Sequence, residues 1–76
     1  MEKAIDKRTA DEVIESIKLK TKGKSRIAKN NSGNLIGVYN FLWGDFFPVM
    51  EKPANESWQP ATVFIGIPES DWIESK

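Results

Sequence analysis

The chain has no cysteine and no histidine, and these absences exclude several kinds of chemistry. Without thiols there can be no disulfide bonds and no thiolate–zinc site. Without imidazole, the commonest general base and the commonest metal ligand are missing. No apolar run approaches the roughly 18 residues of a membrane span, and the first residues, MEKAIDKR, lack the apolar core of a signal peptide. We therefore expect a cytoplasmic protein with no metal, no cofactor and no membrane partner.

The sequence also lacks the residue spacing that is typical of a catalytic motif. The second half of the chain holds six carboxylates at positions 45, 51, 56, 69, 71 and 74, and their spacing matches no catalytic motif. The sequence contains neither a phosphate-binding loop nor the glycine fingerprint of a dinucleotide site. We therefore expect a protein that is not an enzyme.

A length of 76 residues fits one domain, residues 1–76. A domain this small buries a modest fraction of its surface, and oligomerisation is one source of additional stability. The chain nevertheless carries eight aromatic rings, more than one small core accommodates easily. These observations predict a homo-oligomer. Residues 1–8 either extend the first helix or form an N-terminal arm.

Residues 9–23, TADEVIESIKLKTKG, carry the signals of an amphipathic helix. Thr9 and Glu12 have the spacing of a capping box, in which each side chain bonds the backbone of the other residue. Gly23 is suited to the left-handed conformation that ends many helices. Apolar residues recur at the spacing of one helix face, namely Ala10, Val13, Ile14 and Ile17.

The rest of the chain has the pattern of strands and turns. Residues 24–41 predict two strands around a turn at 30–33, where Asn, Ser and Gly are concentrated. Residues 46–50 and 71–74 fit further short strands, whereas residues 60–67 fit either a strand or a short helix. The predicted fold is therefore α+β, with one N-terminal amphipathic helix packed on a small antiparallel β-sheet.

Charge is unevenly distributed along this formally neutral chain. Residues 1–38 hold nine Lys/Arg against five Asp/Glu, whereas residues 39–76 hold two against six, so the halves carry +4 and −4. Six of the eleven cationic residues fall between positions 18 and 29. This run is either a solvated helix end and hairpin edge or a binding site for an anion.

The cationic run precedes a cluster of aromatic residues, and a phosphorylated ligand could use both. Lys24, Arg26 and Lys29 would supply donors to phosphate oxygens. Tyr39 and Trp43 share strand parity with Phe41 if that strand continues, so they would lie on one face. We predict that Arg26 and Lys29 contact phosphate while Tyr39 or Trp43 stacks on a base.

Several short motifs resemble those of small phage proteins, the Thoeris anti-defence proteins that sequester cyclic ADP-ribose-type signals. The matching segments are residues 10–17, 23–24 with Arg26 and Lys29, 58–60 (WQP) and 71–72 (DW). Asn30 and Asn31 stand where that family has a tryptophan. The segment between the Pro and the Asp-Trp is also longer here, and it is apolar.

The resemblance implies a helix packed on a small antiparallel sheet, an oligomer, and ligand pockets between subunits. It also implies structural or interface roles for Trp58, Asp71 and Trp72. On this basis the predicted function is a phage-type anti-defence protein of the host cytoplasm that binds and sequesters a nucleotide immune signal. The first alternative is a small inhibitor that binds a host protein through an aromatic surface. The second is a nucleic-acid-binding module, which the acidic second half makes less favourable.

Overall fold

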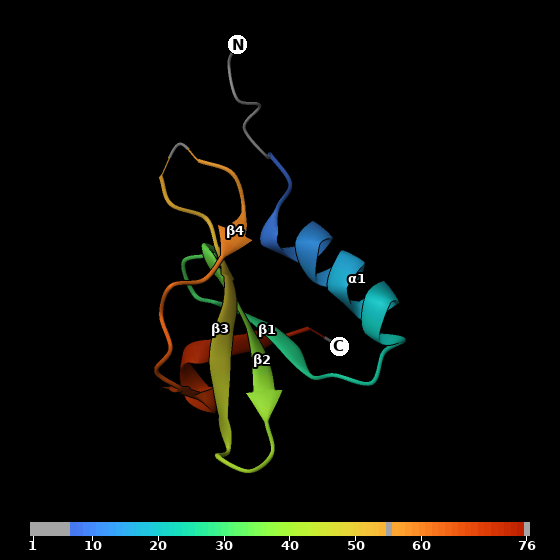
Figure 1. Ribbon diagram of the computed structural model, residues 1–76, viewed down its shortest axis with the longest axis vertical. Helices are drawn as coiled ribbons and strands as arrows, with labels where there is room; N and C mark the ends of the chain where they lie inside the picture. Colours follow the sequence, from blue (N-terminus) through green and yellow to red (C-terminus); the bar gives the residue numbers. More distant parts are fainter. Residues whose placement is uncertain (1–6, 55, 76) are drawn as a thin grey trace.

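The computed structural model describes residues 7–54 and 56–75, which form one helix on a curved antiparallel sheet (Figure 1). The predicted α+β fold is confirmed. Within the described residues, no helix is long and apolar enough to cross a bilayer. The elements in chain order are α1 (Ala10–Thr21), β1 (Ile27–Asn30), β2 (Leu35–Asn40), β3 (Asp45–Glu51), β4 (Gln59–Pro60), β5 (Ile67–Pro68), the 3₁₀ turn η1 (Glu69–Asp71) and β6 (Trp72–Glu74).

The helix α1 begins as its sequence predicts, but it ends one residue before the expected stop. The Thr9 hydroxyl accepts a hydrogen bond from the Glu12 amide at 3.3 Å, and the Glu12 carboxylate accepts one from the Thr9 amide at 3.2 Å. At the other end, both Lys22 and Gly23 are left-handed, with φ of 57° and 72°. The helix therefore stops one residue before the expected glycine, because Lys22 already adopts the capping conformation.

Removing the capping hydroxyl should destabilise the fold modestly. We expect Thr9→Ala to lower the free energy of unfolding by about 1 kcal/mol, because the Glu12 amide loses its acceptor. Urea denaturation measures the effect. Thr9→Ser is the matched control and should unfold like the natural chain, since serine caps as well as threonine. Equal stability of the alanine variant would show that this capping box contributes nothing.

Two apolar clusters lie on opposite faces of the sheet, because successive strand residues point to opposite sides. Ile27 belongs to the cluster under α1 and its neighbour Ala28 to the other. The first cluster contains Ala10, Val13, Ile14, Ile27, Ile36 and Trp58, with Ile17, Val38 and Met50 against it. The second contains Ala28, Phe46 and Trp72, with Leu35, Tyr39 and Ile67 against it.

The second face is enclosed because the sheet curls. The strand order is β4-β3-β2-β1-β6, and β5 also pairs with β3. In a flat sheet, β5 and β6 would stand about 19 Å apart. The chain from Pro68 to Trp72 can span at most about 14 Å when fully extended. The 3₁₀ turn η1 makes the actual span shorter. The sheet must therefore bend until its two edges approach, which buries Phe46 and Trp72 on the concave side.

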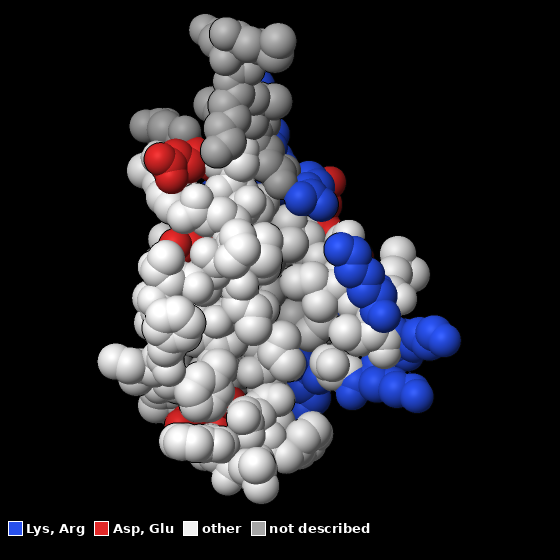
Figure 2. Space-filling model, in the orientation of Figure 1, with Lys and Arg blue, Asp and Glu red and all other residues white. Residues whose placement is uncertain are grey.

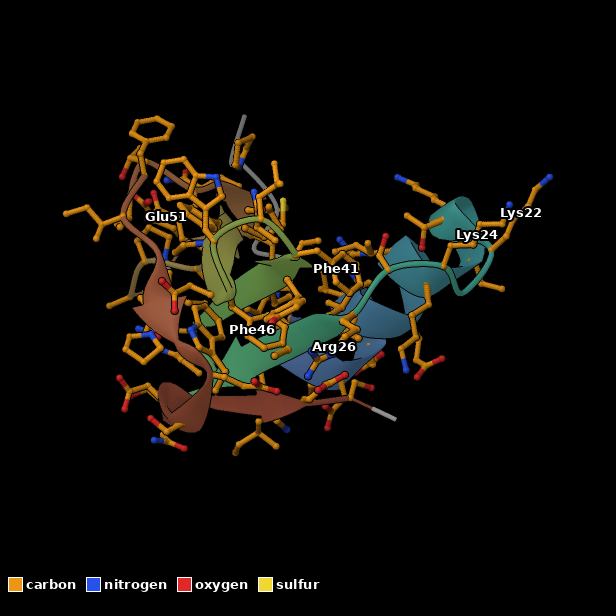
Figure 3. All side chains as sticks on the ribbon, turned by 90° about the horizontal axis from the view of Figure 1, so that it is seen from below. Lys22, Lys24, Arg26, Phe41, Phe46 and Glu51 are labelled. Carbon is orange, nitrogen blue, oxygen red and sulfur yellow. The ribbon has the colours of Figure 1, made fainter. Side chains whose placement is uncertain are left out.

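Trp72 fits on this concave side because the residue beneath it has no side chain. A Cβ added to Gly37 would lie 2.9 Å from the Trp72 ring. Arg26 lies against this cluster near Phe46 (Figure 3), with its guanidinium carbon 4.2 Å from the centre of the Tyr39 ring. Arg26 binds Glu74 through two hydrogen bonds, one of them 2.8 Å from Nε to Oε2, and it also pairs with Glu69. These contacts tie β6 and η1 to the start of β1.

Two segments differ from the sequence expectation. Residues 61–66 form neither strand nor helix, and lie as a loop between β4 and β5. The strand of Tyr39 does not continue to Trp43, because β2 ends at Asn40. The Asn40 side chain accepts hydrogen bonds from the amides of Leu42 at 2.9 Å and Trp43 at 3.3 Å, which turns the chain into β3.

Candidate functional site

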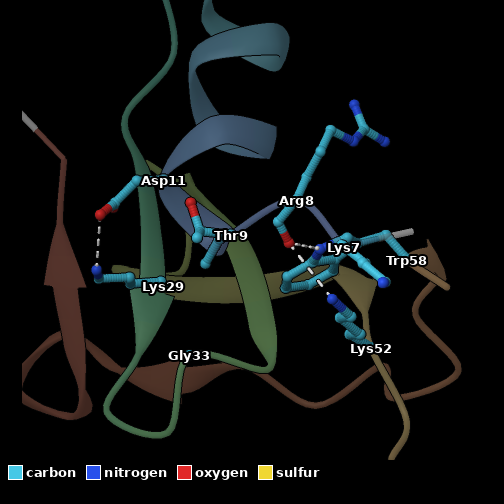
Figure 4. A pocket seen from close by; sticks show the side chains of 9 residues that line it. Lys7, Arg8, Thr9, Asp11, Lys29, Gly33, Lys52 and Trp58 are labelled. Atoms are coloured by element: carbon cyan, nitrogen blue, oxygen red, sulfur yellow. Dashed lines mark hydrogen bonds and ion pairs between the residues drawn. The ribbon is translucent and has the colours of Figure 1, made fainter. Parts of the chain in front are cut away.

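A hollow of about 450 Å³ opens beside the first residue of α1 (Figure 4). Its lining comes from the segment before α1, the first turn of α1, strand β1, the β1–β2 turn, and the residues after β3. We call it the basic hollow, because four of its lining residues are cationic and one is acidic. Its residues are Lys7, Arg8, Thr9, Ala10, Asp11, Lys29, Gly33, Lys52 and Trp58.

One side of the basic hollow is built on the Arg8 carbonyl. The indole Nε1 of Trp58 donates to this oxygen at 2.9 Å, and the ammonium of Lys52 donates to it at 3.4 Å. The Lys52 nitrogen also lies 5.8 Å from the centre of the Trp58 ring. Trp58 is itself buried in the cluster under α1. It therefore anchors the segment before the helix and positions Lys52 at the hollow.

The other side holds an ion pair between β1 and α1. The Lys29 ammonium lies 3.1 Å from the Asp11 carboxylate, and most of the Asp11 side chain is exposed. Exposed ion pairs of this kind contribute about 0–1 kcal/mol, so an incoming anion can displace the Asp11 carboxylate at small cost. Figure 4 shows Lys29 and Lys52 on opposite sides of Thr9. The Lys29 ammonium is held beside Asp11, and the Lys52 ammonium is held beside the Arg8 carbonyl.

The electrostatics of the basic hollow favour an anion. Its cationic side chains add to the positive end of the α1 dipole, where backbone N–H groups are directed. Because Trp58 is almost completely buried, its ring lines the hollow but exposes little of its face for stacking on a base. The arrangement is therefore suited to holding phosphate or carboxylate groups more than a flat base.

The residues predicted to bind phosphate together are separated in the structure. Lys29 faces the basic hollow, whereas Arg26 and Tyr39 lie on the concave side of the sheet. Arg26 pairs with Glu74 and Glu69, whose hydrogen bonds raise the pKa of its guanidinium above the ordinary value. Arg26 therefore stays charged at any working pH, and its charge is balanced within the protein.

The other five predicted residues lie in five different places. Lys24 is exposed between α1 and β1, and Trp43 is exposed in the β2–β3 turn. Trp58 is buried under α1, Trp72 is buried on the concave side, and Asp71 is exposed at the end of η1. Of these five residues, only Trp58 lines the basic hollow.

Sequence reasoning missed three cations of the basic hollow: Lys7, Arg8 and Lys52. Lys7 and Arg8 stand directly before the Thr9 cap, so the predicted helix start already placed them at its positive end. Lys52 carries no comparable signal, because its bond to the Arg8 carbonyl joins residues that are 44 positions apart. Among residues 7–54 and 56–75, no group of carboxylates is placed to hold a metal ion.

Comparisons with protein-family models, with curated proteins and with solved structures found no match to this chain. The similarity to Thoeris anti-defence proteins therefore stays a prediction that rests on the short motifs quoted above.

Proposed function

We propose that this protein is a non-enzymatic binding protein that holds a phosphate-bearing small molecule of cyclic-nucleotide type in the basic hollow. The observation that carries the proposal is the basic hollow at a helix start, where Lys29 and Lys52 lie on opposite sides of Thr9. Its volume of about 450 Å³ lies within the range of small-molecule sites. The protein would act by sequestration, removing its ligand stoichiometrically without turnover.

Lys29 and Lys52, which lie on opposite sides of Thr9, would both turn from their present contacts to hold the phosphate. Lys29 exchanges its contact with Asp11 for the ligand, and Lys52 exchanges its long contact with the Arg8 carbonyl. Both contacts are at or above 3.1 Å, and charge-assisted bonds to phosphate are shorter and stronger. The narrower identification of the ligand as a nucleotide immune signal of a phage host follows from the motif resemblance.

Titration calorimetry with cyclic mononucleotides and cyclic dinucleotides tests this function, with the unphosphorylated nucleoside as the matched ligand. We expect Lys29→Ala and Lys52→Ala each to weaken phosphate-dependent binding about tenfold to a hundredfold, because each removes one charge-assisted contact. Asp11→Asn should strengthen binding severalfold, because it removes the carboxylate that competes for Lys29.

Lys20→Ala is the control, since it deletes the same charge from the exposed far end of α1. It should leave the affinity within about twofold, because charges separated by more than a Debye length are largely screened. A loss in Lys20→Ala equal to that in Lys52→Ala would indicate non-specific attraction and contradict the site. Absence of binding to every nucleotide at millimolar concentration would reject the function.

The predicted alternative of an inhibitor that binds a host protein is favoured by a different observation. Large apolar side chains are exposed in the β2–β3 turn and in the loop before β5. This alternative requires those side chains to remain accessible for binding to another protein. A nucleic-acid groove has less support, because three cations of residues 18–29 already bond to other parts of the protein. Lys18 bonds Ser75, Lys29 bonds Asp11, and Arg26 bonds Glu69 and Glu74.

A further inference from the structure

Seven large apolar side chains form an exposed surface that we call the apolar band: Phe41, Leu42, Trp43, Val49, Val63, Phe64 and Ile65. Phe41, Leu42 and Trp43 are 77, 92 and 70% exposed, and Phe64 and Ile65 are 83 and 75% exposed. In Figure 2, Lys and Arg gather over the α1 side, whereas the part over the β2–β3 turn and residues 61–66 is almost without charge.

The two halves of the apolar band are joined by Phe47 of β3. The Phe47 ring meets the Trp43 ring edge-on, with 5.9 Å between ring centres. On the other side, a Cβ added to Gly66 would lie 2.9 Å from the Phe47 ring. Gly66 directly follows Ile65, so the turn and the loop touch the same ring. The apolar band is therefore continuous across β3.

The fold itself keeps the side chains of the apolar band exposed. The Asn40 side chain holds the turn through the amides of Leu42 and Trp43. The loop is fixed at one end by a 3.1 Å bond from the Ala61 amide to the Val49 carbonyl, and at the other by the pairing of β5 with β3. Both core clusters are filled by other residues. These side chains have no place inside the protein.

The area of the apolar band matches what a stable dimer needs. Its three aromatic side chains alone expose on the order of 350–550 Å², since each can bury about 150–250 Å². That already equals the largest apolar patch on a typical monomer, about 300–600 Å². With the four aliphatic side chains the band approaches the roughly 800 Å² that each partner contributes to a standard interface.

We propose that a second copy of this chain covers the apolar band in a two-fold symmetric dimer. A two-fold contact places the same patch on both sides, so a patch of a single charge sign would oppose its own charge. Residues 41–44 and 61–66 contain no charged residue, and the whole chain has no net charge. The band is therefore the surface on which two identical copies meet without repulsion. This inference does not depend on any ligand in the basic hollow.

Sedimentation equilibrium from low micromolar to near-millimolar concentration tests the dimer. We expect the natural chain to reach twice its mass of 8.6 kDa. Trp43→Ser and Phe64→Ser should each raise the dissociation constant at least about thirtyfold, because exposed aromatic anchors dominate interface energies. Both side chains lie outside the core clusters, so the variants should fold, and their circular dichroism spectra check this.

Leu19→Ser is the matched control, because Leu19 is 81% exposed on α1 and outside the apolar band. It should leave the dissociation constant unchanged. Amide NMR shifts on dilution should change around residues 41–43 and 63–65. A natural chain that stays monomeric at near-millimolar concentration overturns the proposal and leaves the band to a different partner. A dimer that Leu19→Ser weakens and Trp43→Ser does not overturns it as well, because the interface then lies elsewhere.

Discussion

Phe46→Ala is expected to lower the free energy of unfolding by about 3–5 kcal/mol. The Phe46 side chain is fully buried. Its ring centre lies 5.2 Å from that of Tyr39 and 5.9 Å from that of Trp72, and the Arg26 guanidinium carbon is 5.6 Å away. Truncation leaves a cavity that the curled sheet and the ties of Arg26 to Glu69 and Glu74 keep from collapsing.

This loss is large against the total stability of the domain. A chain of 76 residues has a free energy of unfolding of about 4–11 kcal/mol. We therefore expect the alanine variant to unfold at a much lower urea concentration than the natural chain, as followed by tryptophan fluorescence. Phe46→Leu should lose much less, because it refills most of the space.

Phe41→Ala removes the same ring from an exposed position and is the matched control. Its effect should stay within about 0.5 kcal/mol in the monomer. The comparison belongs at the lowest workable protein concentration, since dimer formation stabilises the folded state by mass action. If both alanine variants unfolded at the same denaturant concentration as the natural chain, Phe46 would not be at the centre of a core.

The helix and the first hairpin could be predicted because their signals are local. The Thr9 cap and its glutamate are three residues apart, and the apolar face repeats within two turns. The turn after β1 lies in four consecutive residues that favour turns. The sequence also signals the end of β2, because Asn40 and Gly44 favour a turn and flank the exposed apolar residues. The shared face expected for Tyr39 and Trp43 required the strand to continue past this turn signal, and β2 ends at Asn40.

The curling of the sheet and the candidate site could not be predicted in the same way, because their contacts join distant residues. Arg26 meets carboxylates 43 and 48 residues further along the chain. Trp58 bonds a carbonyl 50 residues before it. Strand alternation alone places Arg26 and Lys29 on opposite faces, since they are an odd number of residues apart. That rule was available from the sequence once β1 had been predicted.

Ile14→Ala is expected to cost about 2–5 kcal/mol, the second large effect, and it concerns the opposite face of the sheet. Ile14 is fully buried between α1 and the sheet, beside Val13, Ile27 and Trp58. Its loss removes methyl contacts and leaves a cavity under the helix. Ile17→Ala should cost less, because Ile17 is only partly buried at the edge of that cluster.

Leu19→Ala separates burial from helix propensity in this comparison. Leu19 lies on the same helix and is exposed, and alanine is the stronger helix former. Leu19→Ala should therefore leave the free energy of unfolding within about 0.5 kcal/mol of the natural chain. Urea midpoints of the three variants should follow burial, with Ile14→Ala lowest, Ile17→Ala next and Leu19→Ala unchanged. A midpoint for Ile14→Ala no lower than that for Leu19→Ala would mean that α1 does not pack on the sheet, and the basic hollow at its start would then lose its wall.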